Sequence, residues 1–452
     1  MPRTRDDTHV VRPRLVHIAP LLVGVLIAVR ASEAIRANSF LWHVRAGSLQ
    51  IDLGSVLTED PFSFTAAGEA WRTQSWLVEL AYGSAESAFG SLAWANWLVF
   101  GAGIILFFLM GIAVYQRSPS VLVTTGALLV GVWLFAPFAQ ARPVIVSYVL
   151  LAVVVVVLTR PDHLAWALVP IFWVFAAVHG SWILAGGLVV LELIRTRNVI
   201  LLRAGIAALG ATLLTAHGVG AWAVLGSFAR NREALTLIQE WAPPDFADIA
   251  QAPFVLIIVG VLVGLARQRI SLADLIVVVP FLAYGLTSQR SVFPADIVLV
   301  PFAAMALPLP TPSRETMSRG MVVAAMVAVA LVALLPMLTR PLGVLDPDRF
   351  PSDDVVDAIR GTRAFNDTAV GGYLIFEAWP GHTVYIDDRA ELYGYDRLAE
   401  FRRALAGDYR TLFADLDIET AVVAVDTPLA VRLAEDGWRP VVTTEAFIAF
   451  AP

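Results

Sequence analysis

The 452-residue sequence contains no cysteine and no lysine. Without cysteine the chain has no disulfide, no thiolate metal site and no cysteine nucleophile. Without lysine it has no side-chain amine for Schiff-base chemistry, and its 32 basic residues are all arginine. A basic set made only of arginine is typical of a GC-rich bacterial genome.

Charged residues are scarce as well, and this scarcity indicates the class of protein. They make up 15% of the chain, against about 25% in soluble domains. Hydrophobic residues make up 58%, and the mean hydropathy is +0.71. The composition therefore predicts a polytopic α-helical membrane protein. Because no basic face emerges, no nucleic-acid partner is expected.

About eleven apolar segments approach the roughly 20 residues that a helix needs to cross the hydrocarbon core. The predicted spans are Leu15–Ile35, Leu92–Tyr115, Val121–Phe138, Val144–Leu158, Leu164–Val178, Trp182–Ile194, Val199–Ala216, Pro253–Ala266, Leu272–Leu286, Ser291–Leu307 and Met321–Leu338. The fifth and sixth are short, and "HGS" at His179–Ser181 separates them. This pattern predicts a hairpin of short or broken helices whose polar break faces protein or water.

The arginines predict the orientation of these spans. Many of them precede the first span or fall in every second loop, a side that the positive-inside rule makes cytoplasmic. They are Arg3, Arg5, Arg12, Arg14, Arg117, Arg160, Arg195, Arg197, Arg203, Arg267, Arg269, Arg314 and Arg319. The first span is predicted to be a retained helix rather than a cleaved signal peptide. The remaining loops and the chain after Thr339 then lie on the extracytoplasmic side.

The division at Thr339 predicts a transmembrane domain over 1–339 and a small α/β domain over 340–452. The second part is acidic, with 20 Asp and Glu against 11 Arg. Predicted strands are 371–378, 383–388, 419–426, 440–444 and 446–450. Predicted helices are 353–359, 395–405, 409–416 and 429–438. This alternation predicts a mixed sheet of four or five strands, and because no glycine-rich phosphate motif follows a strand, no nucleotide site is expected.

The first extracytoplasmic loop, residues 38–91, is unusually rich in polar and aromatic residues. It carries the adjacent acids Glu59 and Asp60, and also His43 and Glu79. The segment 71–89 has apolar residues at helical spacing with Trp and Tyr among them, which predicts a helix in the membrane interface. Aromatic anchoring alone explains such a helix, whereas the nearby acids favour a functional loop.

Several strings, taken in order along most of the chain, resemble a bacterial set of GT-C glycosyltransferases. They are "LWHVRAG", "TEDPFSFTAAGEAW", "QSWLVEL", "QARPVIVSY", "HGSWILAG", "IQEWAPPD", "SQRSVFPADIVLVPFAA" and "GGYLIFEAWPGHTVYIDDRAELYGYD". The resemblance implies a GT-C-like enzyme of the bacterial inner membrane. It would transfer a sugar, with inversion, from a polyprenyl-phosphate donor to an envelope glycan or protein acceptor in the periplasm.

The same resemblance implies the roles of the acids in the first loop. GT-C enzymes commonly place an Asp there, so Asp60, with Glu59 beside it, is expected to be the catalytic carboxylate. It would take the acceptor proton or hold a divalent cation, Mg²⁺ or Mn²⁺. The alternative for Asp60 is a turn residue, because an Asp before a Pro commonly starts a turn.

Ionisable residues at the outer ends of the spans are candidates for binding the donor phosphate. They are Arg142, His179, His217 and Arg290, with His43 in the first loop and Glu240, next to Trp241, in the other large outer loop. Such groups are costly near a membrane unless they are paired or line a cavity, and cations gathered on one face suit a lipid phosphate. The alternative for the arginines is snorkelling to lipid headgroups.

One departure from the pattern of similar proteins keeps other functions open. Similar proteins often carry an Asp shortly before the "WH" pair, where this chain has Asn38 and Ser39. That difference favours a non-catalytic scaffold that binds or hands on lipid-linked glycan. A transporter fits less well, because transporters place charge near the membrane midplane and often in repeated halves.

A last polar cluster lies in the C-terminal part. It contains Asp387, Asp388, Arg389, Glu391 and Tyr393, and it suits either local pairing that fixes a turn or a contact with sugar. Adjacent acids on a strand point to opposite faces, so Asp387 and Asp388 are not expected to share one metal.

Overall fold

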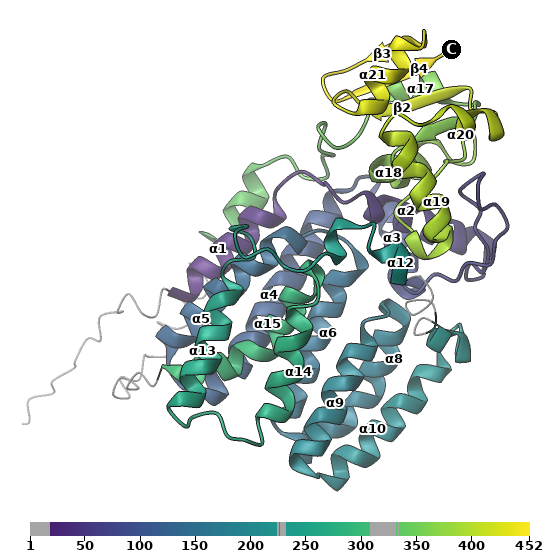
Figure 1. The fold of residues 1–452 in the computed structure, drawn as a ribbon. Coiled ribbons are helices and arrows are strands. Elements are labelled where there is room, and N and C mark those ends of the chain that lie inside the picture. Colours follow the sequence, from purple (N-terminus) through teal and green to yellow (C-terminus); the bar gives the residue numbers. More distant parts are fainter. Residues whose placement is uncertain (1–18, 224–225, 227–231, 308–330, 333) are drawn as a thin grey trace, which may run out of the picture.

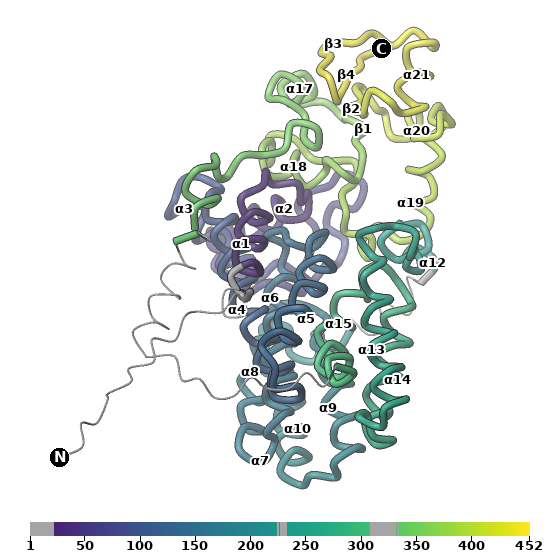
Figure 2. Tube along the Cα trace, turned by 90° about the vertical axis from the view of Figure 1, so that its left-hand side faces the viewer, coloured from purple at the N-terminus to yellow at the C-terminus, as the bar shows by residue number. Residues whose placement is uncertain are grey.

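The computed structural model describes residues 19–223, 226, 232–307, 331–332 and 334–452. Helices form an elongated bundle, and the C-terminal residues form a small α/β unit at one end of it (Figure 1). The view turned by 90° shows the same arrangement, with the sheet at the far end from α7 (Pro161–Leu164) and α10 (Val199–Ala211) (Figure 2). The described chain therefore has a helical part and a C-terminal α/β part, and the boundary at Thr339 stays a prediction.

Each predicted span between Leu92 and Leu307 is largely helical. The bundle helices are α1 (Ala19–Ala31), α4 (Ala93–Arg117), α5 (Val121–Phe135), α6 (Pro143–Leu158), α8 (Leu168–Val178), α9 (Trp182–Thr196), α10 (Val199–Ala211), α13 (Phe254–Ala266), α14 (Leu275–Gly285) and α15 (Gln289–Ala303). The predicted break at "HGS" is present, because α8 ends at Val178 and α9 begins at Trp182.

Within the described residues, three helical stretches are long and apolar enough to cross a membrane: Ala93–Arg117, Val121–Phe138 and Pro161–Val178. The other apolar helices are shorter, so the number of eleven spans stays a prediction. The first predicted span lies partly, and the last mostly, outside the described residues.

Burial within the bundle is unlike that of a soluble protein. Helix α15 is buried all round from Ser291 to Ala303 and packs against α4, α5, α6, α13 and α14. Large apolar side chains on the outer helices are instead exposed, among them Ile105, Phe108 and Ile206. Exposed apolar surface that surrounds a bundle in this way marks a membrane-facing surface, and the chain is a membrane protein.

Residues 38–91, the first outer loop of the predicted topology, contain two helices, α2 (Asn38–Leu53) and α3 (Trp76–Phe89). The sequence predicted a helix only over 71–89, which became α3, and α2 was missed. The two helices touch at glycines: a Cβ on Gly47 would lie 1.7 Å from the Glu79 carbonyl oxygen, and one on Gly83 would lie 2.4 Å from the Ser48 amide nitrogen. Only glycine permits backbones to approach this closely.

The C-terminal unit has a mixed four-stranded sheet, as the sequence predicted, although its first strand was not among the predicted strands. Its order is β1-β2-β4-β3, in which β1 and β2 are parallel and the other pairs antiparallel. Its strands are β1 (Ala364–Asn366), β2 (Thr420–Ala424), β3 (Arg439–Thr443) and β4 (Phe447–Ala451). Its helices are α17 (Asp353–Ile359), α18 (Thr368–Ala378), α19 (Ala390–Leu405), α20 (Arg410–Asp415) and α21 (Pro428–Glu435).

Two of the predicted strands are wrong. Residues 371–378 belong to helix α18, and 383–388 form only an isolated bridge from Val384 to Ser63. The Asp367 side chain caps α18, and a Cβ on Gly372 would lie 2.4 Å from the Asn38 carbonyl oxygen. A capped helix that packs through glycine on α2 therefore overrides the β-propensity of the aromatic and β-branched residues.

The C-terminal unit also packs directly against the membrane part, in addition to the covalent connection along the chain. Helix α18 packs on α2, and Leu237 and Ile238 of the second large outer loop pack against the hydrophobic core beneath the sheet. These contacts set the position of the C-terminal unit over the end of the bundle.

The glycine contact between α2 and α3 gives a stability prediction. Gly47→Ala should destabilise the protein by about 1–3 kcal/mol, since the added methyl group meets backbone and not a flexible side chain. Gly126→Ala on α5, where nothing lies within 4 Å of the added Cβ, is the matched control and should not destabilise. Thermal unfolding in detergent measures both, and equal melting temperatures for the two variants would contradict the close contact.

Candidate active site

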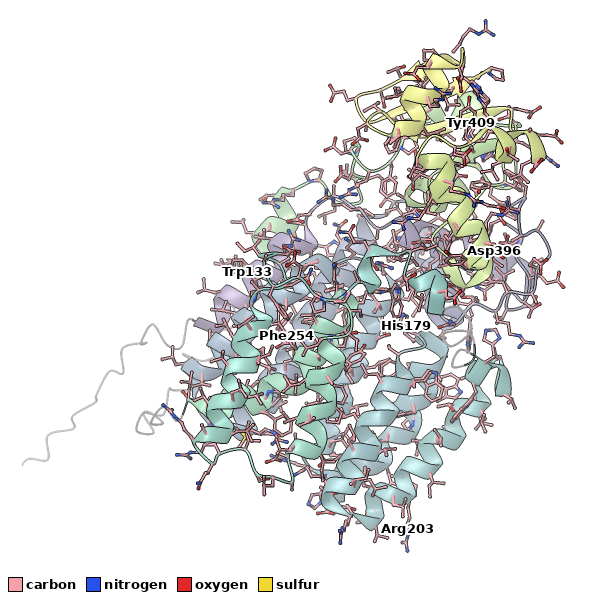
Figure 3. All side chains as sticks on the ribbon, in the orientation of Figure 1. Trp133, His179, Arg203, Phe254, Asp396 and Tyr409 are labelled. Atoms are coloured by element: carbon pink, nitrogen blue, oxygen red, sulfur yellow. The ribbon has the colours of Figure 1, made fainter. Side chains whose placement is uncertain are left out.

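A cavity of about 800 Å³ lies between the end of the bundle and the C-terminal unit. Figure 3 places His179 at this end of the bundle and Arg203 at the opposite end. The ionisable residues that line the cavity include His43, Arg142, His179, Glu240, Arg290, Asp388, Arg389 and Glu391. All the residues predicted to bind the donor phosphate, except His217, are therefore brought together. His217 lies outside this lining, and its Nε2 pairs with the carbonyl oxygen of Thr73 at 2.7 Å.

The bundle contributes a cationic wall. Arg142 is the residue before α6, and Arg290 lies in the first turn of α15. Arg142 Nη1 lies 3.4 Å from one oxygen of Glu240, and Arg290 Nε lies 3.3 Å from the other. Burial raises the pKa of Glu240, but the two arginines outweigh it and the pKa is lowered. The two guanidinium groups thus converge on a single anionic group.

The C-terminal unit contributes an acidic wall that faces the same cavity. The Asp388 side chain is open to the cavity, and Oδ1 accepts a hydrogen bond from Trp42 Nε1 at 2.7 Å. Partial desolvation in the cavity and the neighbouring charge of Asp387 raise the pKa of Asp388 to about 6. A carboxyl group with this pKa is poised to accept a proton near neutral pH.

Asp60, predicted as the catalytic carboxylate, lies elsewhere. It is buried outside the cavity lining, and its oxygens accept hydrogen bonds from the amides of Phe62 and Ser63, from the Ser63 hydroxyl and from Arg389 Nη1. Glu59 is exposed and also lies outside the lining. Their catalytic role stays a prediction, one that their positions do not favour.

The partner of Asp60 is the centre of a buried cluster. Arg389 makes two contacts with Asp387, at 2.8 Å and 2.6 Å, and one with Asp60, at 2.7 Å. Its guanidinium carbon lies 4.6 Å from the ring centre of Trp71 and 5.4 Å from that of Phe62. Asp60 therefore ties the first outer loop to the C-terminal unit, as a turn residue that also carries a buried ion pair.

A second buried acid, Glu79, pairs with the imidazole of His43. Its Nδ1 lies 2.7 Å from Glu79, which also accepts hydrogen bonds from Gln50 and Thr73. Burial lowers the pKa of His43, although Glu79 opposes the shift. The imidazole packs against the indole of Trp42 with ring centres 3.5 Å apart.

The residues around Asp60 do not fit a divalent cation. A guanidinium group already occupies one carboxylate oxygen, and the Ser63 amide and hydroxyl occupy the other. Over the part of the chain that the structure describes, no group of three His, Asp or Glu is arranged to hold a metal ion.

The sequence analysis did not single out Trp42, and it gave Asp388 no catalytic role. The available signals were the "WH" pair directly after the first span and the "DDR" triplet after an apolar run. Neither signal indicates that Trp42 and Asp388 are in contact, because 346 positions of sequence separate the two residues.

Comparisons with known proteins support the fold. No family model matches the chain, and no curated protein matches it. A crystal structure of the Archaeoglobus fulgidus oligosaccharyltransferase, tethered with an acceptor peptide, matches 91% of this chain and 69% of its own with a TM-score of 0.56. The two sequences are 11% identical, so the likeness concerns the fold alone. It supports the GT-C-like fold that the sequence resemblance implied.

The Asp60 contacts predict an effect on stability. Asp60→Ala should cost about 3 kcal/mol, because it removes one partner of a buried ion pair. Glu59→Ala, at the exposed neighbour, should change stability by less than about 0.5 kcal/mol. Thermal unfolding of the purified variants measures both, and an unchanged melting temperature for Asp60→Ala would contradict the buried pair.

Proposed function

We propose that this protein is a membrane glycosyltransferase that moves a sugar from a polyprenyl-phosphate donor to an acceptor hydroxyl. One observation carries the proposal: a single cavity has two convergent arginines on its bundle wall and the Asp388 carboxyl group on the facing wall. Transfer of a sugar from a phosphate needs these two functions, stabilisation of the departing phosphate and removal of the acceptor proton.

The proposed step is a direct displacement. The acceptor oxygen forms a bond to the anomeric carbon as the bond from that carbon to the phosphate oxygen breaks, which inverts the configuration. The acceptor proton passes to Asp388, and the phosphate leaves with the bonding electron pair. Arg142 and Arg290 would neutralise the charge that develops on the phosphate, with His179 beside them in the lining.

Asp388 takes the role first expected of Asp60. The acid that similar proteins often carry before the "WH" pair falls near Ser39, and Ser39 lines the same cavity as Asp388. Trp42, three residues after Ser39, holds Asp388 by a hydrogen bond. In this proposal the C-terminal unit supplies a carboxylate to the place where the loop acid is absent.

The cavity would open to the periplasm of a bacterial inner membrane. In support, Arg203 lies at the end of the bundle away from the C-terminal unit (Figure 3), and the positive-inside rule makes an arginine-rich end cytoplasmic. The acceptor would be an envelope glycan or protein, and a divalent cation, Mg²⁺ or Mn²⁺, is no part of the proposed step.

A non-catalytic protein that binds or hands on lipid-linked glycan is the second candidate. It is favoured by the absence of an acid at Asn38 and Ser39. Such a protein would use the arginine wall and would not need Asp388, so the two candidates differ in what replacement of Asp388 does.

Replacement of Asp388 tests the enzyme proposal. With purified protein and polyprenyl-phosphate sugars, Asp388→Asn should lower the transfer rate about 10²–10⁴-fold. Wild-type activity should rise with pH through about 6, because Asp388 accepts a proton only when it is ionised. Asp396→Asn, at an exposed acid of α19 outside the cavity lining, is the control and should keep full activity. Donor binding without transfer by the wild type would favour the second candidate.

Replacement of the arginines tests the phosphate site. Arg142→Gln or Arg290→Gln should weaken donor binding about 10–100-fold, the loss expected for a hydrogen bond to a charged group. Arg203→Gln, at the far end of the bundle, should bind as the wild type does. Binding of a polyprenyl phosphate in detergent gives the affinities, and unchanged affinity in both cavity variants would rule out the assignment.

A further inference from the structure

We propose that Trp42 is a positioning residue that holds the Asp388 carboxylate in the cavity across the joint between the first outer loop and the C-terminal unit. The inference rests on the proposed function for its catalytic consequence. Its structural content is that the indole N–H of Trp42 orients the Asp388 carboxylate of the C-terminal unit, and this content stands without the proposed function.

The geometry of Trp42 suits this role. Its Nε1 donates to Asp388 Oδ1 at 2.7 Å, within the range of a strong hydrogen bond to a charged acceptor. The indole is 6% exposed, with the His43 ring against one part of it and the Trp71 ring at 5.6 Å in an edge contact. Glu79 holds His43 in turn. The donor is therefore fixed in direction by packed neighbours.

The backbone of Asp388 is fixed from the other side. Arg389, the next residue, donates its amide hydrogen to Asp387 Oδ1 at 2.9 Å, and its guanidinium group is held by Asp387 and Asp60. Asp387 is fully buried in this cluster, whereas the Asp388 side chain is open to the cavity. The side chains of Asp387 and Asp388 thus point in different directions, and the Asp388 carboxylate faces the cavity and the Trp42 indole.

The hydrogen bond from Trp42 has a chemical consequence that packing alone would not have. A donor that faces a carboxylate favours the ionised form. Asp387 and Glu391 act against ionisation of Asp388, while Arg142 and Trp42 favour it. Loss of the indole N–H should therefore make Asp388 bind its proton more tightly.

The test measures the protonation of Asp388 without any transfer assay. Carbodiimides react with protonated carboxyl groups, so the pH at which labelling of Asp388 falls by half, read from fragment masses, reports its titration. In the full-length protein we expect this midpoint near pH 6 for the wild type, and roughly 0.5–1 unit higher in Trp42→Phe. Trp97→Phe, at an exposed Trp of α4, is the control and should match the wild type.

An equal midpoint in Trp42→Phe and in the wild type would overturn the proposal. If Trp42→Phe does not fold, indole ¹⁵N resonances of the wild type give the answer instead. One indole signal should shift with pH through the Asp388 midpoint and lose that shift in Asp388→Asn, and a set of signals unaffected by Asp388→Asn would equally overturn the proposal. A shifted midpoint in a protein without transfer activity would leave the positioning role intact and remove the proposed function.

Discussion

The buried ion pair between Asp60 and Arg389 is the interaction on which the rest of the site depends. It joins a loop of the membrane part to the C-terminal unit across 329 positions of sequence. Both side chains are almost fully buried, where a lone charge would be very costly. Together with the packing of α18 on α2, the pair fixes the position of the C-terminal unit, and the rings of Trp71 and Phe62 pack around the guanidinium group.

This docking position completes the cavity. The bundle alone offers arginines that pair with Glu240, and the C-terminal unit alone offers the Asp388 carboxyl group without those arginines. Only the joint between them sets Asp388 opposite Arg142 and Arg290, and the Trp42 hydrogen bond crosses that joint. In our proposal the bundle binds the donor phosphate and the C-terminal unit accepts the proton, so the reaction needs both parts.

Much of the fold could be predicted from the sequence, because long apolar runs dictate helices in a membrane. The break at His179 and the mixed sheet were also predictable, from a polar interruption and from alternating patterns. Helix α18 was not, since its identity depends on Gly371 and Gly372 approaching the backbone of other segments. Local propensity favours a strand there, and tertiary packing decides otherwise.

The prediction of the site was likewise limited, because it depends on tertiary contacts that the local sequence does not show. Arg142, His179 and Arg290 could be placed together, because orientation by arginines puts the outer ends of all spans on one face. The role of Asp60 could not be predicted, because a carboxylate in a polar loop has the same sequence signature whether it faces a substrate or a buried arginine. Trp42 and Asp388 lacked any local signal of their contact.

The central claim is that the C-terminal unit, rather than the first loop, supplies the catalytic carboxylate. The most direct measurement compares sugar transfer by Asp388→Asn and Asp60→Asn, each at a temperature where the variant is folded. The account predicts that transfer is lost in Asp388→Asn and remains within about tenfold of wild type in folded Asp60→Asn. Full activity in Asp388→Asn together with loss of activity in folded Asp60→Asn would contradict it.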